Sequence, residues 1–221
     1  MTTALIPVKG LEQSKSRLLS HLSDARREAL TLAMLEDLID ALDRTPGIDR
    51  IAVATPDPIV AEHAAAAGAE ILMRPEPGLN AALEDARTRL EHDAGSGLLI
   101  VLGDVAGALP EDFARLLGEA DRSGARGVWL APSSDGGTSA LLQRPPDLIP
   151  CRFGPDSAKR HREAAEAIGV RFSELPLPSL AIDLDRPEDL EAFLAQPGGG
   201  PRTRALLESL LDRDRSPASD A

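Results

Sequence analysis

Residues 4–18 read A-L-I-P-V-K-G-L-E-Q-S-K-S-R-L, and this stretch decides how the rest of the chain is interpreted. A short apolar run leads into a loop with a glycine and then into the start of a helix, so the order strand, loop, helix is predicted. Lys9, Lys15 and Arg17 form a dense cluster of cations in an otherwise acidic chain. Loop amides, a helix N-terminus and these cations suit a polyanion such as a phosphate chain; a basic surface loop is the alternative.

No standard nucleotide-binding motif explains this loop. A Walker A loop requires G-x-x-x-x-G-K-[ST], whereas Ser14 stands in place of the second glycine and Gly10 lies one residue too close to the lysine. A Rossmann G-x-G-x-x-G is also absent after the first predicted strand. A nucleotide bound here would be held by another design.

Composition excludes several classes of partner. The chain has 221 residues, which favours a single domain, and its 24 basic and 36 acidic residues give a net charge of −12. This charge argues against binding to nucleic acid or to an anionic membrane, and four Phe, one Trp and no Tyr provide no platform for stacking bases. An anionic ligand must therefore meet a local positive site.

The cysteine content and the hydropathy indicate the compartment. Cys151 is the single cysteine, so it forms no internal disulfide, and it is expected to be a small buried residue in a reducing environment. The N-terminus lacks a basic region followed by a long apolar run, and no segment approaches the roughly 20 apolar residues that span a bilayer. A soluble, cytoplasmic protein is expected.

Apolar periodicity predicts alternating strands and helices, which is typical of an α/β, Rossmann-like, mostly parallel sheet flanked by helices. Residues 1–195 are expected to form this domain. Residues 196–221 begin P-G-G-G-P and are expected to be a flexible C-terminal tail with one short helix over 203–211. The strands are expected at residues 4–8, 48–55, 69–73, 98–102, 127–131, 139–143, 170–175 and 180–184.

Three carboxylates are candidates for a magnesium site. Asp104 follows a strongly apolar strand, and Asp183 and Asp185 in I-D-L-D project to the same side of a later predicted strand. Mg²⁺ prefers hard oxygen ligands and phosphate oxygens. The alternatives are a turn or cap at Asp104 and an N-cap at Asp185.

Two glycine-containing segments are candidates for holding a small carboxylate. D-G-G-T spans residues 135–138 and F-G-P-D-S spans residues 153–157, where glycine lets a ligand approach the backbone. Two ordinary turns are the alternative. His161 follows one turn into the next helix, and its position favours a solvated helix residue over a contact with an anion.

Taken in order, several motifs resemble the CofC/FbiD family of guanylyltransferases of coenzyme F420 biosynthesis. These motifs are I-P-V-K-G-L-x-x-S-K-S-R-L, P-G-L-N, the strand-end aspartate, D-G-G-T-S-A-L-L, F-G-P-D-S-A-K-R-H and I-D-L-D-R-P-E-D-L, and they span residues 4–194. The resemblance implies a fold of the nucleotide-diphospho-sugar transferase type. It also implies transfer of GMP from GTP to phosphoenolpyruvate, 2-phospho-L-lactate or 3-phospho-D-glycerate, and a downstream F420 transferase that takes the product.

The same resemblance assigns residues to roles. The acceptor's carboxylate would lie against Thr138, Gly154 and Ser157, and Mg²⁺ would join its phosphate to Asp104, Asp183 and Asp185. Lys9, Gly10, Lys15 and Arg17 would face the GTP phosphates and stabilise the leaving pyrophosphate, while Gly78 and Asn80 would contact guanine or ribose.

The chain departs from the family at two places beside the proposed acceptor pocket. The family commonly has D-L-P where this chain has Asp104-Val105-Ala106-Gly107, and G-G-T-N where this chain has Ser139. Two other functions stay open, the first because a D-x-D pair such as Asp183 and Asp185 also serves glycosyltransferases and the second because of these altered residues. One is a nucleotide-sugar-type transferase of other specificity, and the other is a catalytically silent protein that binds GTP or a phosphoacid.

Overall fold

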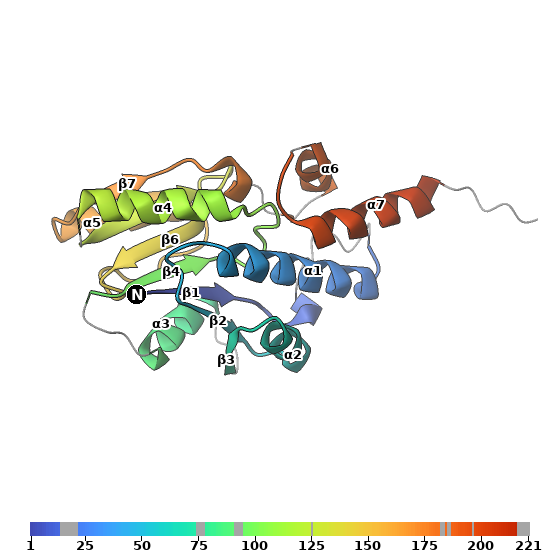
Figure 1. The fold of residues 1–221 in the computed structure, drawn as a ribbon, viewed down its shortest axis with the longest axis horizontal. Helices are drawn as coiled ribbons and strands as arrows, with labels where there is room; N and C mark the ends of the chain where they lie inside the picture. The colour runs from blue at the N-terminus through green and yellow to red at the C-terminus, as the bar shows by residue number, and fades with distance from the viewer. Residues whose placement is uncertain are drawn as a thin grey trace, which may run out of the picture.

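The structure, a computed structural model, describes residues 1–13, 22–73, 78–90, 95–124, 126–181, 184, 187–195 and 197–215. In this part of the chain, seven strands form one sheet in the order β3-β2-β1-β4-β6-β5-β7 (Figure 1). The strands are β1 (Thr2–Pro7), β2 (Arg50–Thr55), β3 (Glu70–Met73), β4 (Gly97–Val101), β5 (Gly127–Pro132), β6 (Thr138–Arg144) and β7 (Phe172–Glu174).

The sheet is parallel except for β6. This strand runs antiparallel to both of its neighbours, β4 and β5, while the other pairs are parallel. A short turn at residues 133–137 joins β5 to β6, and a turn of this length can connect only antiparallel strands. The predicted mostly parallel sheet is confirmed. As a result, the first residue of β6 lies at the sheet edge where β1 and β4 end.

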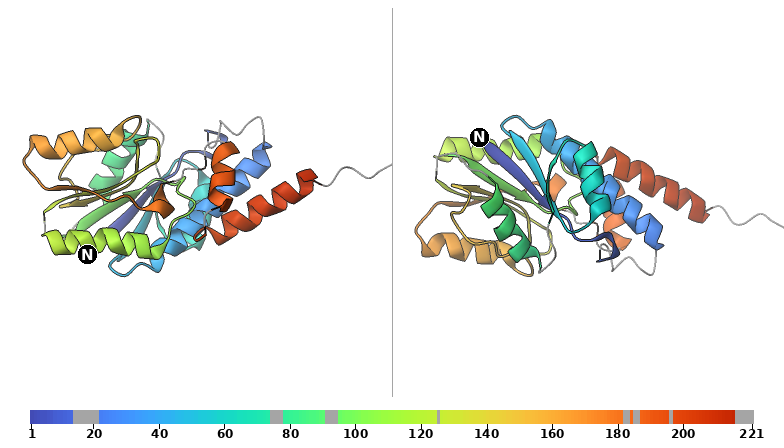
Figure 2. Two further views of the ribbon diagram at one scale, coloured as in Figure 1. Left: turned by 90° about the horizontal axis from the view of Figure 1, so that it is seen from above. Right: turned by 90° about the horizontal axis from the view of Figure 1, so that it is seen from below.

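Helices cover both faces of the sheet, as Figure 2 shows. Helices α1, α2 and α4 pack on one face, and α3 and α5 pack on the other. Side chains alternate between the faces along each strand: Ala4 and Ile6 contact the α1 side, whereas Leu5 contacts the α3 side. The helices are α1 (Asp24–Asp43), α2 (Pro58–Ala66), α3 (Leu79–Arg89), α4 (Pro110–Ser123), α5 (Ser157–Ala167), α6 (Pro187–Ala195) and α7 (Pro201–Arg215), with 3-10 turns η1 (Leu11–Gln13) and η3 (Pro178–Leu180).

Local sequence signals account for several of these elements. Asp57 caps α2, since its carboxylate accepts hydrogen bonds from the backbone amides of Ile59 (2.9 Å) and Val60 (3.3 Å), and Pro58 opens that helix. Trp129 is fully buried, as expected of a core residue. Among the helices that the structure describes, none has both the length and the apolar character needed to cross a membrane.

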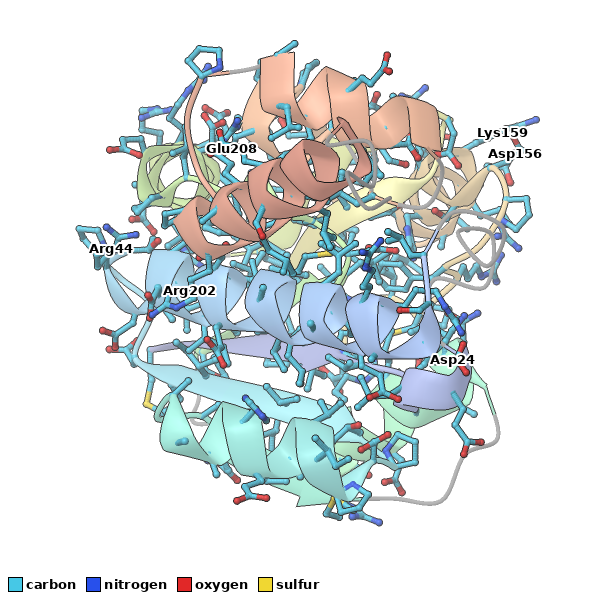
Figure 3. All side chains as sticks on the ribbon, turned by 90° about the vertical axis from the view of Figure 1, so that its right-hand side faces the viewer. Asp24, Arg44, Asp156, Lys159, Arg202 and Glu208 are labelled. Atoms are coloured by element: carbon cyan, nitrogen blue, oxygen red, sulfur yellow. The ribbon has the colours of Figure 1, made fainter. Side chains whose placement is uncertain are left out.

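Two expectations about the C-terminal part were wrong. Residue 180 ends η3, and residues 181 and 184 are also outside any strand, so the strand expected at 180–184 is not formed in the described residues. The segment read as a flexible tail carries α7, which is longer than the expected helix and lies along α1 (Figures 1 and 3). Its Leu207 and Leu210 are buried with Met34 of α1 and Phe193 of α6 in a separate small core.

Asp37 anchors the start of α7. Its buried carboxylate accepts hydrogen bonds from the backbone amides of Arg202 (3.1 Å) and Thr203 (2.8 Å) and from the Thr203 hydroxyl (2.8 Å). Arg202 also bonds Asp40 at 2.5 Å, and Figure 3 shows Arg202 at the junction of the two helices. A carboxylate on α1 therefore satisfies the free amides at the N-terminus of α7.

Replacing Asp37 with alanine is expected to lower the free energy of unfolding by about 2 kcal/mol or more, because two backbone amides, the Thr203 hydroxyl and the Arg202 guanidinium lose a charged acceptor. Urea denaturation measures this loss, and proteolysis is expected to cut α7 first. Asp43→Ala on the same helix is the control, since Asp43 is exposed. Equal stability of the two variants would contradict this anchoring role.

Candidate active site

The candidate site lies at the sheet edge where β1 and β4 end and β6 begins. Lys9 and Gly10 follow β1, Asp104 follows β4, and Thr138 opens β6. The Leu102 amide donates a hydrogen bond to the Ser139 carbonyl at 3.0 Å, which joins the segment before Asp104 to the segment after Thr138. Lys15, Arg17, Asp183 and Asp185 lie outside the described residues.

Asp57 braces the loop that carries Lys9 and Gly10. Its Oδ2 accepts a hydrogen bond from the Leu11 amide at 2.9 Å, while its Oδ1 caps α2. The Val8 amide also bonds the Ala54 carbonyl at 2.9 Å. These bonds hold the loop against the end of β2 and leave Lys9 exposed. Asp57-Pro58 is a local signal for a helix start, but no local signal links Asp57 to Leu11, 46 positions away.

The carboxylate of Asp104, just after β4, is partly buried. Its Oδ1 is buried and has no hydrogen-bond partner within the described chain, which is costly for a carboxylate oxygen unless a ligand supplies one. The Leu184 amide donates to the Asp104 carbonyl at 3.4 Å, so the residue between Asp183 and Asp185 lies beside Asp104. Within the described residues no three His, Cys, Asp or Glu side chains group together, and Asp104 is the one member of the predicted set that the structure describes.

The D-G-G-T turn is held by its own aspartate. Asp135 Oδ1 accepts hydrogen bonds from the Gly137 amide (2.9 Å) and the Ser133 hydroxyl (2.5 Å). A Cβ at Gly137 would lie 2.5 Å from the Ser133 oxygen and 2.9 Å from Asp135 Oδ1, so a larger residue there would displace this hydrogen-bonded pair. The Ala158 amide of α5 donates to the Gly136 carbonyl at 3.4 Å, and this contact joins the two glycine-containing segments.

Thr138, Ser157 and His161 form one buried hydrogen-bonded group. The Thr138 hydroxyl lies 2.9 Å from the Ser157 hydroxyl and 3.2 Å from His161 Nδ1. The Arg152 amide donates to His161 Nε2 at 3.0 Å, so a neutral ring carries its proton on Nδ1 and donates to Thr138. The Thr138 and Ser157 hydroxyls together carry two protons. One proton forms the hydrogen bond between the two hydroxyls, and the other is available to another acceptor. The group is therefore a net hydrogen-bond donor, as an anionic ligand requires.

His161 was expected to be solvated, and it is instead fully buried. Burial, together with the charges of Arg160 and Arg152, lowers its pKa from 6.5 to about 4. The ring also meets the edge of Phe153, with 5.0 Å between ring centroids. The helical position alone indicated neither the burial nor the contact with the Thr138 hydroxyl, which lies on β6.

The low pKa of His161 predicts a pH dependence of stability. The unfolded chain takes up this proton below pH 6.5, while the folded protein resists it down to about pH 4, so the folded state loses stability as the pH falls through this range. The loss from this residue is about 3 kcal/mol between pH 7 and pH 4. Urea denaturation of the wild type and His161→Gln at both pH values measures it. The same pH dependence in both proteins would contradict the prediction.

Asn80 makes a different contact from the one expected. Its side-chain amide forms two hydrogen bonds with the backbone of Phe153. Nδ2 donates to the Phe153 carbonyl (3.1 Å), and Oδ1 accepts from the Phe153 amide (2.8 Å). Asn80 thus fixes the segment that contains Gly154, whereas a contact with guanine or ribose stays a prediction. Gly78 precedes α3 with a φ of 103°, a backbone conformation that favours glycine.

Cys151 is buried, as expected. Burial, reinforced by Glu84, raises its pKa to about 12, so its thiol stays protonated at neutral pH and is not a nucleophile.

Comparison with known proteins identifies the family. The model of the family described as "Guanylyl transferase CofC like" matches residues 2–218. The chain belongs to this family. The match includes α7, in agreement with the packing of that helix against α1.

Relatives within the CofC-like family carry two different names. A phosphoenolpyruvate guanylyltransferase of Rubrobacter xylanophilus is 42% identical over 88% of this chain and 94% of its own length. A 3-phospho-D-glycerate guanylyltransferase of Colwellia psychrerythraea is 35% identical over 89% of this chain and 93% of its own length. The fold is also that of a protein of Desulfovibrio desulfuricans G20 assigned as a nucleotide-diphospho-sugar transferase, with a TM-score of 0.76 at 17% identity over 96% and 97% of the two chains. The expected fold class is confirmed.

Proposed function

We propose that this protein transfers GMP from GTP to a small phosphorylated carboxylic acid and releases pyrophosphate. Phosphoenolpyruvate is the first candidate acceptor, and 3-phospho-D-glycerate and 2-phospho-L-lactate are the others; the first two are named in relatives that align over most of both chains. The observation that carries the proposal is the buried Oδ1 of Asp104, which has no partner among the described residues and lies at the sheet edge with the Gly10 loop and the Thr138 group. The pathway, coenzyme F420 biosynthesis, follows from the sequence resemblance.

The reaction needs no side-chain base. An oxygen of the acceptor's phosphate, already anionic, attacks the α-phosphorus of GTP. A new bond forms between that oxygen and the α-phosphorus, and the bond from the α-phosphorus to the oxygen that bridges to the β-phosphorus breaks. The difficulty is to bring two anions together and to stabilise the departing pyrophosphate, so electrostatic preorganisation is the main requirement.

Residues of the chain divide this work. Lys9, Lys15 and Arg17, with the Gly10 backbone, are proposed to bind the triphosphate and to stabilise pyrophosphate. Asp104, Asp183 and Asp185 are proposed to hold Mg²⁺, which when bound screens and aligns phosphate oxygens. The unpartnered oxygen of Asp104 and the contact of Leu184 with the Asp104 backbone support this assignment.

The acceptor's carboxylate is proposed to meet Thr138, Gly154 and Ser157. The spare hydroxyl proton of the Thr138–Ser157 pair supports this role, because a carboxylate accepts hydrogen bonds and donates none. Asn80 and His161 hold the segment from Arg152 to Gly154 in place through backbone contacts.

Pyrophosphate release tests the proposal. The full-length protein is incubated with Mg²⁺, each of GTP, ATP, CTP and UTP in turn, and each of the three phosphoacids. Release is expected with GTP and at least one phosphoacid, and not when the acceptor is omitted. Binding of GTP without release in any combination would favour a silent binding protein. A further incubation replaces the phosphoacid with a sugar phosphate, and release there with any of the nucleotides, but not with the phosphoacids, would favour a transferase of other specificity.

Gly10→Ala tests the proposed approach of GTP to the first loop. A Cβ at Gly10 would meet only Asp57 Oδ2, at 3.9 Å, so the fold tolerates alanine. If phosphate oxygens pack against this backbone, the KM for GTP is expected to rise about tenfold or more, on the scale of one lost charged contact. Steady-state kinetics measure it, with the melting temperature as the control for folding. An unchanged KM for GTP would remove Gly10 from the nucleotide site.

A further inference from the structure

Arg160 on α5 has hydrogen-bonding groups that the described part of the chain leaves unused. Its Nε and Nη2 atoms are buried and have no hydrogen-bond partner within the described residues. On the same helix Arg162 is paired with Glu174, and Lys159 is paired with Glu163 at 3.9 Å. A guanidinium edge that is buried without an acceptor loses its hydration without compensation, so these two atoms are candidates for binding a ligand.

The two unused atoms belong to one edge of the guanidinium. Nε–H and Nη2–H point in parallel, and this edge binds a carboxylate through both of its oxygens. Nη2 lies close to Gly154: a Cβ built on that glycine would lie 3.3 Å from this atom. The volume that a side chain would fill at Gly154 is therefore within hydrogen-bonding reach of Arg160, and the φ of 114° favours glycine at this position.

The surroundings of this space are donors. Ser157 lies one turn before Arg160 on α5, its amide donates to the Gly154 carbonyl at 3.1 Å, and its hydroxyl bonds Thr138 at 2.9 Å. The Thr138–Ser157 pair has one hydroxyl proton to donate, as derived above. A guanidinium edge beside a hydroxyl donor matches the charge and the hydrogen-bonding pattern of a carboxylate.

We propose that the Nε–Nη2 edge of Arg160 binds the carboxylate of the acceptor and selects phosphorylated acids over simple phosphate esters. This inference rests on the proposed function for the identity of the acceptor. It adds to the Thr138, Gly154 and Ser157 contacts the positive charge that they lack. His161, wedged between Thr138 and the Arg152 amide, acts as a positioning residue for the hydroxyl donor.

Arg160→Gln, Arg160→Lys and the control Lys159→Gln test this inference in the full-length protein. Lys159 directly precedes Arg160, and it projects at the edge of the molecule (Figure 3). The substitution Lys159→Gln removes the same charge as Arg160→Gln. Arg160→Gln is expected to raise the KM for phosphoenolpyruvate and for 3-phospho-D-glycerate about 10- to 100-fold, while the KM for GTP stays unchanged. Arg160→Lys keeps the charge without the parallel donors, so an intermediate value is expected, and Lys159→Gln is expected to match the wild type.

Glycerol phosphate, which carries CH₂OH where phosphoglycerate carries its carboxylate, separates the two anionic groups of the acceptor. The rate of transfer to glycerol phosphate is expected to be low in the wild type and equally low in Arg160→Gln. An equal loss with glycerol phosphate and with 3-phospho-D-glycerate would place Arg160 on the phosphate and overturn the carboxylate assignment. Unchanged KM values for both phosphoacids in an active Arg160→Gln protein would overturn the inference altogether.

Binding and stability measurements keep this test separate from the proposed function. Calorimetry with phosphoenolpyruvate alone is expected to show binding to the wild type and about 10- to 100-fold weaker binding to Arg160→Gln, whether or not GMP is transferred. If transfer fails but this difference holds, the inference stands and the proposed function falls. Because the two donors have no partner to lose, the unliganded melting temperature is expected to be unchanged or raised in Arg160→Gln. A lower melting temperature with unaltered phosphoenolpyruvate binding would show a structural arginine and overturn the inference.

Discussion

Asp104→Asn is expected to lower the turnover number by about 10²-fold or more while leaving the protein folded. Asparagine has the same shape but lacks the negative charge that a divalent cation requires. The buried Oδ1 has no hydrogen bond to lose among the residues that the structure describes, so the melting temperature without Mg²⁺ is expected to stay the same or rise. Pyrophosphate release at saturating GTP and phosphoacid measures the loss of turnover.

Asp147→Asn is the matched control for this prediction, because Asp147 is exposed and the substitution removes the same charge. It is expected to retain the wild-type turnover. A second readout is the rise of melting temperature on adding Mg²⁺ with GTP, which Asp104→Asn is expected to reduce. Near-normal turnover in Asp104→Asn would remove Asp104 from the proposed metal site.

Gly200→Ala is expected to affect both stability and turnover, although Gly200 lies in the glycine-rich segment before α7. A Cβ there would lie 2.4 Å from the Ala106 carbonyl oxygen and 2.9 Å from the Phe193 ring. The backbone at Gly200 also has a φ of 75°. Relief of the clash requires the segment after Asp104 to move, so about 2–4 kcal/mol of unfolding free energy and much of the activity are expected to be lost.

Gly169→Ala separates the clash from the backbone strain. Gly169 has a similar φ of 66°, and a Cβ at this position meets nothing within 4 Å. This variant is expected to lose only about 1 kcal/mol and to keep its turnover. Urea denaturation and pyrophosphate release are measured on both variants. Equal losses of stability and turnover in the two variants would show that Gly200 is needed only for its backbone conformation. The C-terminal segment would then not support the Asp104 loop.

Local patterns in the sequence predicted the strands of the sheet and the edge that carries the site. Apolar runs that end in Lys9-Gly10 and in Gly103-Asp104 are buried parallel strands, and side chains beyond their carboxyl ends meet at one edge by geometry. The turn at D-G-G-T could likewise be predicted, because Asp135 holds it through hydrogen bonds to Ser133 and Gly137, two residues away on either side.

Features that depend on contacts between residues far apart in the sequence could not be predicted from local patterns. The glycines of P-G-G-G-P resemble a linker by composition, yet a Cβ at Gly199 or Gly200 would collide with backbone atoms of residues 106–108. Leu184 continues an apparent strand pattern, but it packs in the small core with Phe193 and Leu207. His161 is buried against Thr138, and the Nε–Nη2 edge of Arg160 lies near Gly154. The helix periodicity of α5 reveals neither contact.

The most direct test of the account is ³¹P nuclear magnetic resonance of the full-length protein with Mg²⁺, GTP and phosphoenolpyruvate. The expected result is loss of the phosphoenolpyruvate signal and the appearance of two coupled signals from a new phosphate–phosphate linkage, together with one equivalent of pyrophosphate. In Asp104→Asn these signals are expected to appear at least about 10²-fold more slowly. Persistence of GTP and of all three phosphoacids, tested one at a time with the folded wild-type protein, would contradict the account.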